Sequence, residues 1–253
     1  MAEKLRVPDD FHRGVNRAAS VESAVWLLGH MCSHLGLDDL GDKEVLDVGC
    51  GVKFTQALID RSLPVKRYVG IDVYKDLIDF LLEAVGDPRF DYSHIDVHNE
   101  RYNPDGEVLS EHTQLPVGDQ TFDIICLFSV FTHLEPHDYR SMLKVLRPYV
   151  KDDGRLFYTL YVDELTEGGY GLMDTMRARI LRDVPVDRIT EALASGSGRI
   201  ETFRDLNPAS PLKWAVYSER YARDLIDGTG WKALSLSPPT NAYIQHHFVC
   251  APC

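Results

Sequence analysis

The sequence predicts an α/β fold: a doubly wound, mostly parallel sheet of seven strands with an antiparallel last strand. Five short apolar runs alternate with helical patterns, which is typical of β/α units in a parallel sheet. Two more apolar runs near the C-terminus lie too close together for a helical crossover, so we expect them to pair antiparallel. A helix before the first strand and an inserted cap after the fifth complete the predicted architecture.

Each predicted element rests on its own pattern. The N-terminal helix is expected over 20–37, where apolar residues recur at every third or fourth position. The same spacing predicts helices in the gaps between the strands and after the cap, at 54–61, 75–85, 137–150 and 218–227. The strands are expected at the apolar runs 44–48, 67–72, 89–94, 122–128, 155–161, 231–236 and 243–250.

The 253 residues, 44% of them hydrophobic, are enough to bury one sizeable core, and we expect a single domain. Two glycine-rich stretches interrupt the β/α alternation after the fifth strand, and this break predicts the cap. The domain therefore divides into an N-terminal helical segment, a binding core, the inserted cap and a C-terminal helix with two strands, at 1–43, 44–161, 162–214 and 215–253.

Composition limits the classes of function. A formal net charge of −12 argues against nucleic acid as the partner, because affinity for phosphate backbones comes from clustered Lys and Arg. No apolar run approaches the length of about 18 residues that a membrane span needs, and no signal pattern opens the chain, which predicts a cytoplasmic protein. The five cysteines are scattered and odd in number, so we expect reduced thiols. The oligomeric state stays open.

A glycine-containing loop follows the first predicted strand. In Asp47-Val48-Gly49-Cys50-Gly51 the glycines allow the backbone to turn tightly and to approach a ligand closely. Asp72 ends the second strand about twenty residues on, where a carboxylate can accept hydrogen bonds from ribose hydroxyls. A nicotinamide-dependent enzyme would need a third glycine at the position of Phe54, so this alternative ranks lower.

Together these motifs resemble the class I S-adenosylmethionine-dependent methyltransferases over 44–161. The resemblance also covers His94-Ile95-Asp96-Val97, which matches the family's acid near adenine, and the stretch from Phe128 to Leu134 after the fourth strand. It implies S-adenosyl-L-methionine as the cofactor. The cofactor contacts that it implies come from Asp47, Gly49, Cys50, Gly51, Asp72, Val73, Asp96, Val97 and Phe128.

The chain departs from the family pattern at two places. Lys53 stands where the family's loop often has a further glycine, and its side chain points either to solvent or toward the cofactor's carboxylate. The connection 99–113 is longer and more polar than the minimal one, and it either reaches over the adenine side or forms a surface loop.

Methyl transfer to a hydroxyl requires that the acceptor lose a proton. His133 and His137 follow the fourth strand, whose carboxyl end faces the ligand crevice, and each is a candidate general base. The alternatives are that His133 orients a loop and that His137 caps a helix start with Asp138. Acceptor contacts are expected from Phe11, Tyr170, Trp214 and Tyr217, with simple packing as the alternative.

No metal is expected from the sequence. His30 and His34 are four residues apart, as are His94 and His98, but neither pair has a companion third ligand nearby in the sequence. His246-His247 lies in a predicted strand, where neighbouring side chains face opposite sides, which favours a structural role.

The predicted function is therefore methyl transfer from S-adenosylmethionine to a small-molecule acceptor, most directly to a hydroxyl of a metabolite or saccharide. Two alternatives stay open. One is a protein of the same fold that binds the cofactor and senses or stabilises a partner without methyl transfer. The other is N-methylation of a small molecule.

Overall fold

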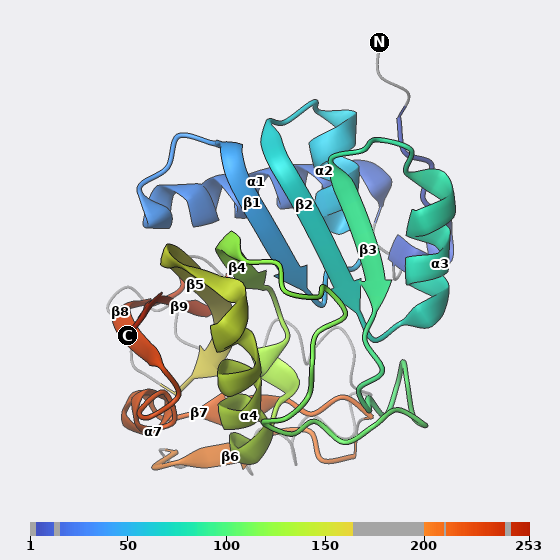
Figure 1. Ribbon diagram of the computed structural model, residues 1–253. Helices are drawn as coiled ribbons and strands as arrows, with labels where there is room; N and C mark the ends of the chain where they lie inside the picture. Colours follow the sequence, from blue (N-terminus) through green and yellow to red (C-terminus); the bar gives the residue numbers. More distant parts are fainter. Residues whose placement is uncertain (1–3, 13–15, 164–199, 210, 241–243) are drawn as a thin grey trace.

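The computed structural model describes residues 4–12, 16–163, 200–209, 211–240 and 244–253. Its centre is a sheet whose parallel strands stand in the order β3-β2-β1-β4-β5 (Figure 1). β9 runs antiparallel to β5 and is followed at the edge by β8, which is antiparallel to β9. The predicted doubly wound sheet with an antiparallel last strand is confirmed. The strands are β1 (Leu40–Val48), β2 (Val65–Asp72), β3 (Phe90–His94), β4 (Phe122–Leu127), β5 (Val150–Val162), β8 (Trp231–Ser237) and β9 (His246–Pro252).

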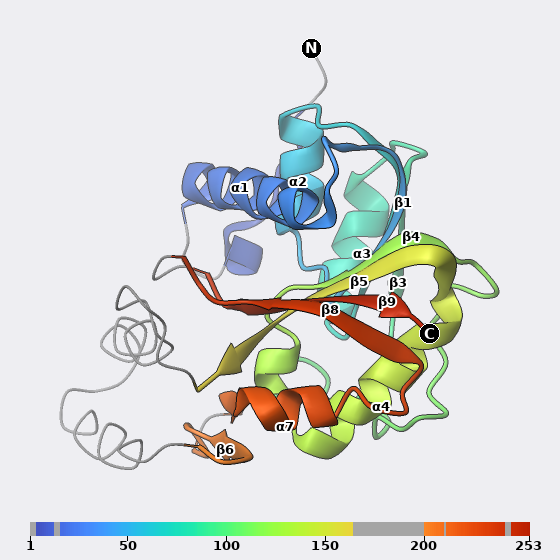
Figure 2. The same cartoon turned by 90° about the vertical axis from the view of Figure 1, so that its left-hand side faces the viewer.

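Helices cover both faces of this sheet (Figure 2). Val45 of β1 packs in the cluster that includes α1, α2 and α3, whereas its neighbour Leu46 packs in the cluster with α4 and α7. Because both faces are covered, the central strands are apolar on both sides, which explains why they appear in the sequence as short continuous apolar runs. The helices are α1 (Arg17–Leu35), α2 (Lys53–Asp60), α3 (Lys75–Ala84), α4 (Pro136–Leu146) and α7 (Glu219–Asp224), with 3₁₀ turns η1 (Asp9–His12), η2 (Phe131–His133) and η3 (Arg147–Tyr149).

Helix α1 has well-defined ends. The side chain of Asn16 accepts a hydrogen bond from the backbone N–H of Ala18, and Gly36 ends the helix in the left-handed conformation at φ 69°. The segment before it is tied to α2, because the carboxylate of Asp60 accepts from the backbone N–H of Leu5 and from Arg17, both at 2.9 Å. Among the described helices, none combines the length and the apolar character needed to span a bilayer.

Most of the predicted cap lies outside the described residues. The described residues near the C-terminal end of the cap include β6 (Phe203–Asp205), which pairs antiparallel with β7 (Ala215–Tyr217). β7 in turn lies parallel to the last residues of β5. These two strands were not predicted, because three residues are too few to show the alternation of a strand. They place the segment 211–213 beside the carboxyl ends of the central strands, where it helps to form the site described next.

Candidate functional site

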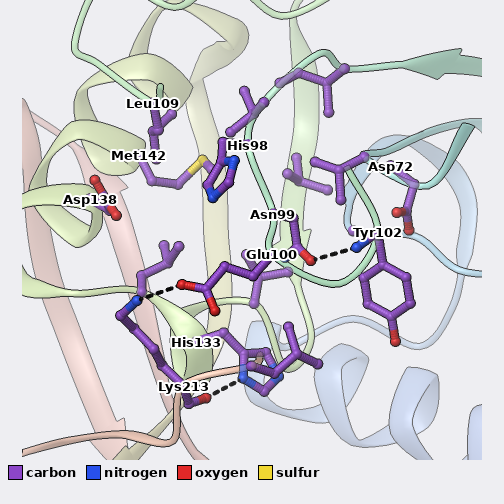
Figure 3. A pocket seen from close by; sticks show the side chains of 18 of the residues that line it. Asp72, His98, Asn99, Glu100, Tyr102, Leu109, His133, Asp138, Met142 and Lys213 are labelled. Carbon is purple, nitrogen blue, oxygen red and sulfur yellow. Dashed lines mark hydrogen bonds and ion pairs between the residues drawn. The ribbon is translucent and has the colours of Figure 1, made fainter. Parts of the chain in front are cut away.

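A cavity of about 290 Å³ lies at the carboxyl ends of β1 to β4 (Figure 3). β1 is the point where the strand order reverses, since β2 lies on one side of it and β4 on the other, and open α/β sheets bind ligands at such a point. The wall continues through the loop after β3, the first turns after β4, α4 and the segment 211–213. In Figure 3, Asp72 and Tyr102 lie on one side of the cavity and His133 and Lys213 on another.

The loop after β1 requires glycine. Gly49 has φ 76° and Gly51 has φ 52°, a left-handed conformation that other residues adopt only with strain. A Cβ atom at Gly49 would lie 2.6 Å from Cγ2 of Val130, so a larger residue does not fit. Gly49 lines the cavity, and the loop is anchored by the N–H groups of Gly49 and Cys50, which donate to the carbonyl of Ile71.

Asp72 joins this loop to the end of β2. One carboxylate oxygen accepts from the N–H of Gly51 and the other from the N–H of Tyr74, both at 2.9 Å. The side chain is only 7% exposed, yet it forms part of the cavity wall. A carboxylate offers about four lone-pair sites, so Asp72 can hold the loop and still accept hydrogen bonds from a ligand.

Asp47, Cys50 and Gly51, which we expected at the cofactor, do not line the cavity. Asp47 is buried, and its carboxyl accepts a hydrogen bond of 2.5 Å from the hydroxyl of Tyr68. Burial raises the pKa of Asp47 to about 7, and the nearby charge of Asp72 acts in the same direction. Cys50 packs over Gly70, and a Cβ atom added at Gly70 would lie only 2.9 Å from the Sγ of Cys50. Both side chains face the α1–α3 side of the sheet. They therefore pack against the loop on the side away from the cavity.

The third strand leads to an apolar part of the wall. Ile95 and Val97 line the cavity, whereas Asp96 between them is exposed and accepts a 3.0 Å hydrogen bond from Asn103. The predicted acid near adenine therefore points away, as alternation along extended backbone dictates. The long connection 99–113 does reach over the cavity, and it contributes wall residues that the prediction did not name: Asn99, Glu100, Tyr102, Val108 and Leu109.

Of the two candidate bases, only His133 lies on the cavity wall. Its Nδ1 is 2.6 Å from the backbone carbonyl oxygen of Lys213. A carbonyl can only accept, so Nδ1 carries the proton and donates, and the neutral ring has its lone pair on Nε2. His137 is exposed and pairs with Asp138 at 3.3 Å, outside the wall. It does not cap α4, because the residue at the cap is Glu135.

The predicted acceptor residues lie elsewhere. Phe11 packs against Tyr74 and Phe80, with ring centroids 5.7 and 5.4 Å apart. Tyr217 is fully buried, and its hydroxyl donates to the carbonyl of Leu134. Trp214 is partly buried against the cluster formed by Tyr161, Ile200 and Val216. These three side chains form no part of the cavity wall, and Tyr170 lies outside the described residues.

Lys213 is a wall residue that the sequence analysis missed. Its Nζ lies 3.6 Å from a carboxylate oxygen of Glu100 and 3.5 Å from one of Glu135. Burial acts to lower the pKa of Lys213, but the two carboxylates outweigh it and the pKa is raised. The ion pairs connect the segment before β7 with the loop after β3 through Glu100, and with the start of α4 through Glu135. No local motif could have predicted the contact with Glu100, because it joins residues more than 100 positions apart in the sequence.

Lys53 does not point toward the cavity. Its Nζ donates to the hydroxyl of Ser23 in α1 at 2.8 Å, which connects the start of α2 to the N-terminal helix. The residue that departs from the family pattern therefore leaves the glycine loop and the cavity clear of a side chain.

Ser129 is held at the cavity wall in an unusual conformation, with φ 60°. Its N–H donates to Oγ1 of Thr159 at 2.8 Å, and that hydroxyl donates to Oε1 of Gln245 at 2.6 Å. The amide nitrogen of Gln245 in turn donates to the hydroxyl of Ser129 at 3.0 Å. This closed network, made by β5 and the residue before β9, holds a strained residue at the site.

Comparison with known proteins agrees with this geometry. Residues 46–158 match the family model described as a methyltransferase domain. The fold is similar to that of PH0226 protein from Pyrococcus horikoshii OT3, at 14% identity and a TM-score of 0.54, over 96% of this chain and 99% of that one. It is also similar to an S-adenosylmethionine-dependent methyltransferase from Mesorhizobium loti, at 12% identity and a TM-score of 0.53, over 89% and 98% of the two chains.

A third similar structure is the mitomycin 7-O-methyltransferase MmcR, at 13% identity and a TM-score of 0.54. The match covers 92% of this chain but 54% of MmcR, so the chain spans about half the length of that protein. At such identities the structural matches establish a shared fold.

Proposed function

Because the chain carries a class I S-adenosylmethionine-dependent methyltransferase domain, we propose that it transfers the cofactor's methyl group to a hydroxyl of a small molecule. The acceptor that we propose is a metabolite or a saccharide. The observation that carries this proposal is the position of His133, whose ring lies on the cavity wall with its Nδ1 held by the carbonyl of Lys213.

The residues of the cavity fit S-adenosylmethionine. Gly49 brings its backbone to the cavity wall in a turn that other residues adopt only with strain, and Asp72 presents a carboxylate for ribose hydroxyls. Ile95 and Val97 offer apolar surface for a flat base. We propose that these four residues hold the cofactor together with Val73 and Phe128, which also line the cavity. When bound, the cofactor supplies an electrophilic methyl group on a positively charged sulfur.

His133 would act as the general base. In the neutral ring, Nε2 can take the proton of an acceptor hydroxyl as that oxygen becomes a nucleophile, since imidazole titrates close to neutral pH. The carbonyl of Lys213 would stabilise the resulting ring through the Nδ1–H donor at 2.6 Å. Lys213 is itself held by Glu100 and Glu135, so the orientation of the base depends on this ion-pair cluster.

The wall also indicates the character of the acceptor. Leu109, Met142 and Leu212 supply apolar surface, and Asp138 and Lys213 supply charge. Such a mixture suits a compact molecule with an apolar body and one or more hydroxyls. MmcR, which has a similar fold, is described as the mitomycin 7-O-methyltransferase, and this supports a hydroxyl as the acceptor group.

Two alternatives are tested by the same experiment. A cofactor-binding protein without transferase activity would bind S-adenosylmethionine through Asp72 and give no methylated product. An N-methyltransferase would modify amines and not hydroxyls, and because a neutral amine attacks without prior loss of a proton it would depend less on His133.

The experiment is an acceptor screen with isotopically labelled S-adenosylmethionine, followed by two matched variants. We expect His133→Gln to bind the cofactor normally and to lose at least about 100-fold in turnover, the usual contribution of a general base. His137→Gln, a histidine four residues away but outside the wall, should keep full turnover. Equal turnover of the two variants would exclude His133 as the base. Cofactor binding without product across hydroxyl and amine acceptors would favour the binding-protein alternative.

A further inference from the structure

Three histidines meet on the α1 side of the sheet, and none of them lines the cavity. His30 and His34 lie one turn apart on α1, and His247 comes from β9; Figure 2 shows this helix alongside the strand. One nitrogen of each ring lies within 4.8 Å of the corresponding nitrogens of the other two. The structure therefore supplies the third ligand that the sequence spacing of His30 and His34 lacked.

The other histidine pair from the sequence analysis behaves differently. His94 Nε2 is 3.2 Å from the carbonyl oxygen of Val73, and His98 Nδ1 is 2.9 Å from that of Pro104. Each ring donates to a backbone carbonyl, so this pair has an ordinary structural explanation. His246 and His247 face opposite sides of β9, as predicted for neighbours in a strand, and only His247 faces α1.

Three ring nitrogens of the cluster formed by His30, His34 and His247 lack an ordinary structural explanation. His247 is 1% exposed, and both of its ring nitrogens are buried without a hydrogen bond of normal geometry among the described residues. The same holds for Nε2 of His30. Buried polar atoms in folded proteins nearly always have partners. Unpartnered nitrogens on two adjacent rings of the cluster therefore indicate a missing ligand, which would take one nitrogen from each ring.

Two of the three rings are also held in place by stacking. Phe157 stacks on His247 with centroids 4.8 Å apart, and Trp26 stacks on His30 at 4.9 Å. Stacking fixes the faces of these two rings and leaves their nitrogens at the edges.

We propose that His30, His34 and His247 bind a divalent transition-metal ion, with zinc as the ion that this ligand set fits best. Imidazole nitrogens select zinc, copper or nickel over magnesium and calcium, which prefer oxygen ligands. Three histidines leave one tetrahedral position for water. At a Zn–N distance of about 2.0–2.1 Å the nitrogens would stand about 3.3 Å apart, so each separation must shorten by at most about 1.5 Å. His34 is exposed and free of close packing on one side, which makes this adjustment easy.

The test uses the metal-free full-length protein and Co²⁺ as a coloured substitute for zinc. We expect saturable binding of one Co²⁺ with the visible absorption of a tetrahedral nitrogen site, and stoichiometric displacement by Zn²⁺. His34→Gln should weaken Zn²⁺ binding by at least tenfold, because loss of even an outer-sphere partner costs 10- to 100-fold. Since His34 is exposed, this variant should fold normally, which circular dichroism would verify.

His112→Gln is the matched control, since His112 is an exposed histidine beside Glu111, away from both the cluster and the cavity wall. It should bind zinc as the wild type does. Failure of the wild type to bind Co²⁺ or Zn²⁺, or equal binding by His34→Gln and His112→Gln, would overturn the proposal. Absorption typical of sulfur ligation would also overturn it, because it would show that a cysteine binds the metal.

Discussion

Gly49 is the position where the cavity tolerates the least change. Substitution by alanine would combine left-handed backbone strain, about 1–2 kcal/mol, with a Cβ placed 2.6 Å from Val130. We expect Gly49→Ala to bind S-adenosylmethionine at least about tenfold more weakly in isothermal titration, a loss of 1.4 kcal/mol or more. Gly36→Ala is the control, since Gly36 has φ 69° but open space around it. Gly36→Ala should lower the free energy of unfolding, because its backbone strain is similar, and should leave cofactor affinity unchanged. Wild-type cofactor affinity in Gly49→Ala would contradict the proposed role of Gly49 in holding the cofactor.

Asp47 predicts a pH dependence of stability. Its pKa is about 7 in the folded protein against an ordinary value of 3.8, and burial is the main cause. Between these values the folded state keeps a proton that the unfolded state has released, so the free energy of unfolding falls as the pH rises through this window. The shift corresponds to a loss of about 4 kcal/mol by pH 8.

Urea unfolding at pH 4 and pH 8 checks this prediction. Asp47→Asn cannot ionise but can still accept from Tyr68, and it should lack that part of the pH dependence. Its stability relative to the wild type should therefore increase from pH 4 to pH 8. If the free energies of unfolding of the two proteins changed in parallel with pH, the prediction would be contradicted, because Asp47 would then ionise as easily in the folded state as in the unfolded state.

At the scale of elements, the sequence predicted what local pattern determines. The five parallel strands and the helices between them follow from apolar periodicity, and Gly49, Asp72, Val73, Val97 and Phe128 reach the cavity because they stand at or after strand ends. Side-chain direction was harder to predict. Each of Asp47 and Asp96 belongs to a matching motif, yet alternation turns its side chain away from the cavity.

The wall residues that were missed depend on long-range structure. Glu100 and Lys213 come from irregular segments, and their meeting requires β6 and β7 to bring the end of the predicted cap back to the sheet. The cluster of His30, His34 and His247 likewise depends on how α1 crosses the sheet. Neither contact has a local sequence pattern, which explains why the strands could be predicted and these sites could not.

The network of Ser129, Thr159 and Gln245 shows one element supporting another. Gln245→Met keeps the length of the side chain but removes the amide that holds Thr159 and Ser129. We expect a loss of about 1–3 kcal/mol in the free energy of unfolding, because buried polar groups lose their partners. Cofactor affinity should fall several-fold as well, since Ser129 lies on the cavity wall.

Gln56→Met separates these two effects. Gln56 is also fully buried, but its amide donates to the carbonyl of Leu5 on the N-terminal segment, away from the cavity. This variant should lose stability and keep its cofactor affinity. If Gln245→Met also kept wild-type affinity, the network would be purely structural and the strained conformation of Ser129 would have no role in binding.

At the scale of the whole molecule, the proposed metal site joins segments near opposite ends of the chain. His30 belongs to α1, which precedes the first strand, and His247 to β9, which pairs with β5 in the middle of the sheet. A ligand that binds only the folded state stabilises it by about 2.7 kcal/mol at a free concentration 100 times its dissociation constant. For a protein of this size we expect Zn²⁺ to raise the melting temperature by roughly 5–10 °C.

Thermal unfolding with Zn²⁺ and then with excess chelator measures this effect. The wild type should lose the added stability when the metal is removed. In His34→Gln the effect of the metal should be at most about half as large, because a site bound tenfold more weakly contributes about 1.4 kcal/mol at the same free Zn²⁺. Cofactor affinity should be equal with and without Zn²⁺, because none of the three ligands lines the cavity. A zinc-induced rise of the same size in His34→Gln would mean that the stabilising ion binds elsewhere, and the connection between the two ends of the fold would then rest on packing alone.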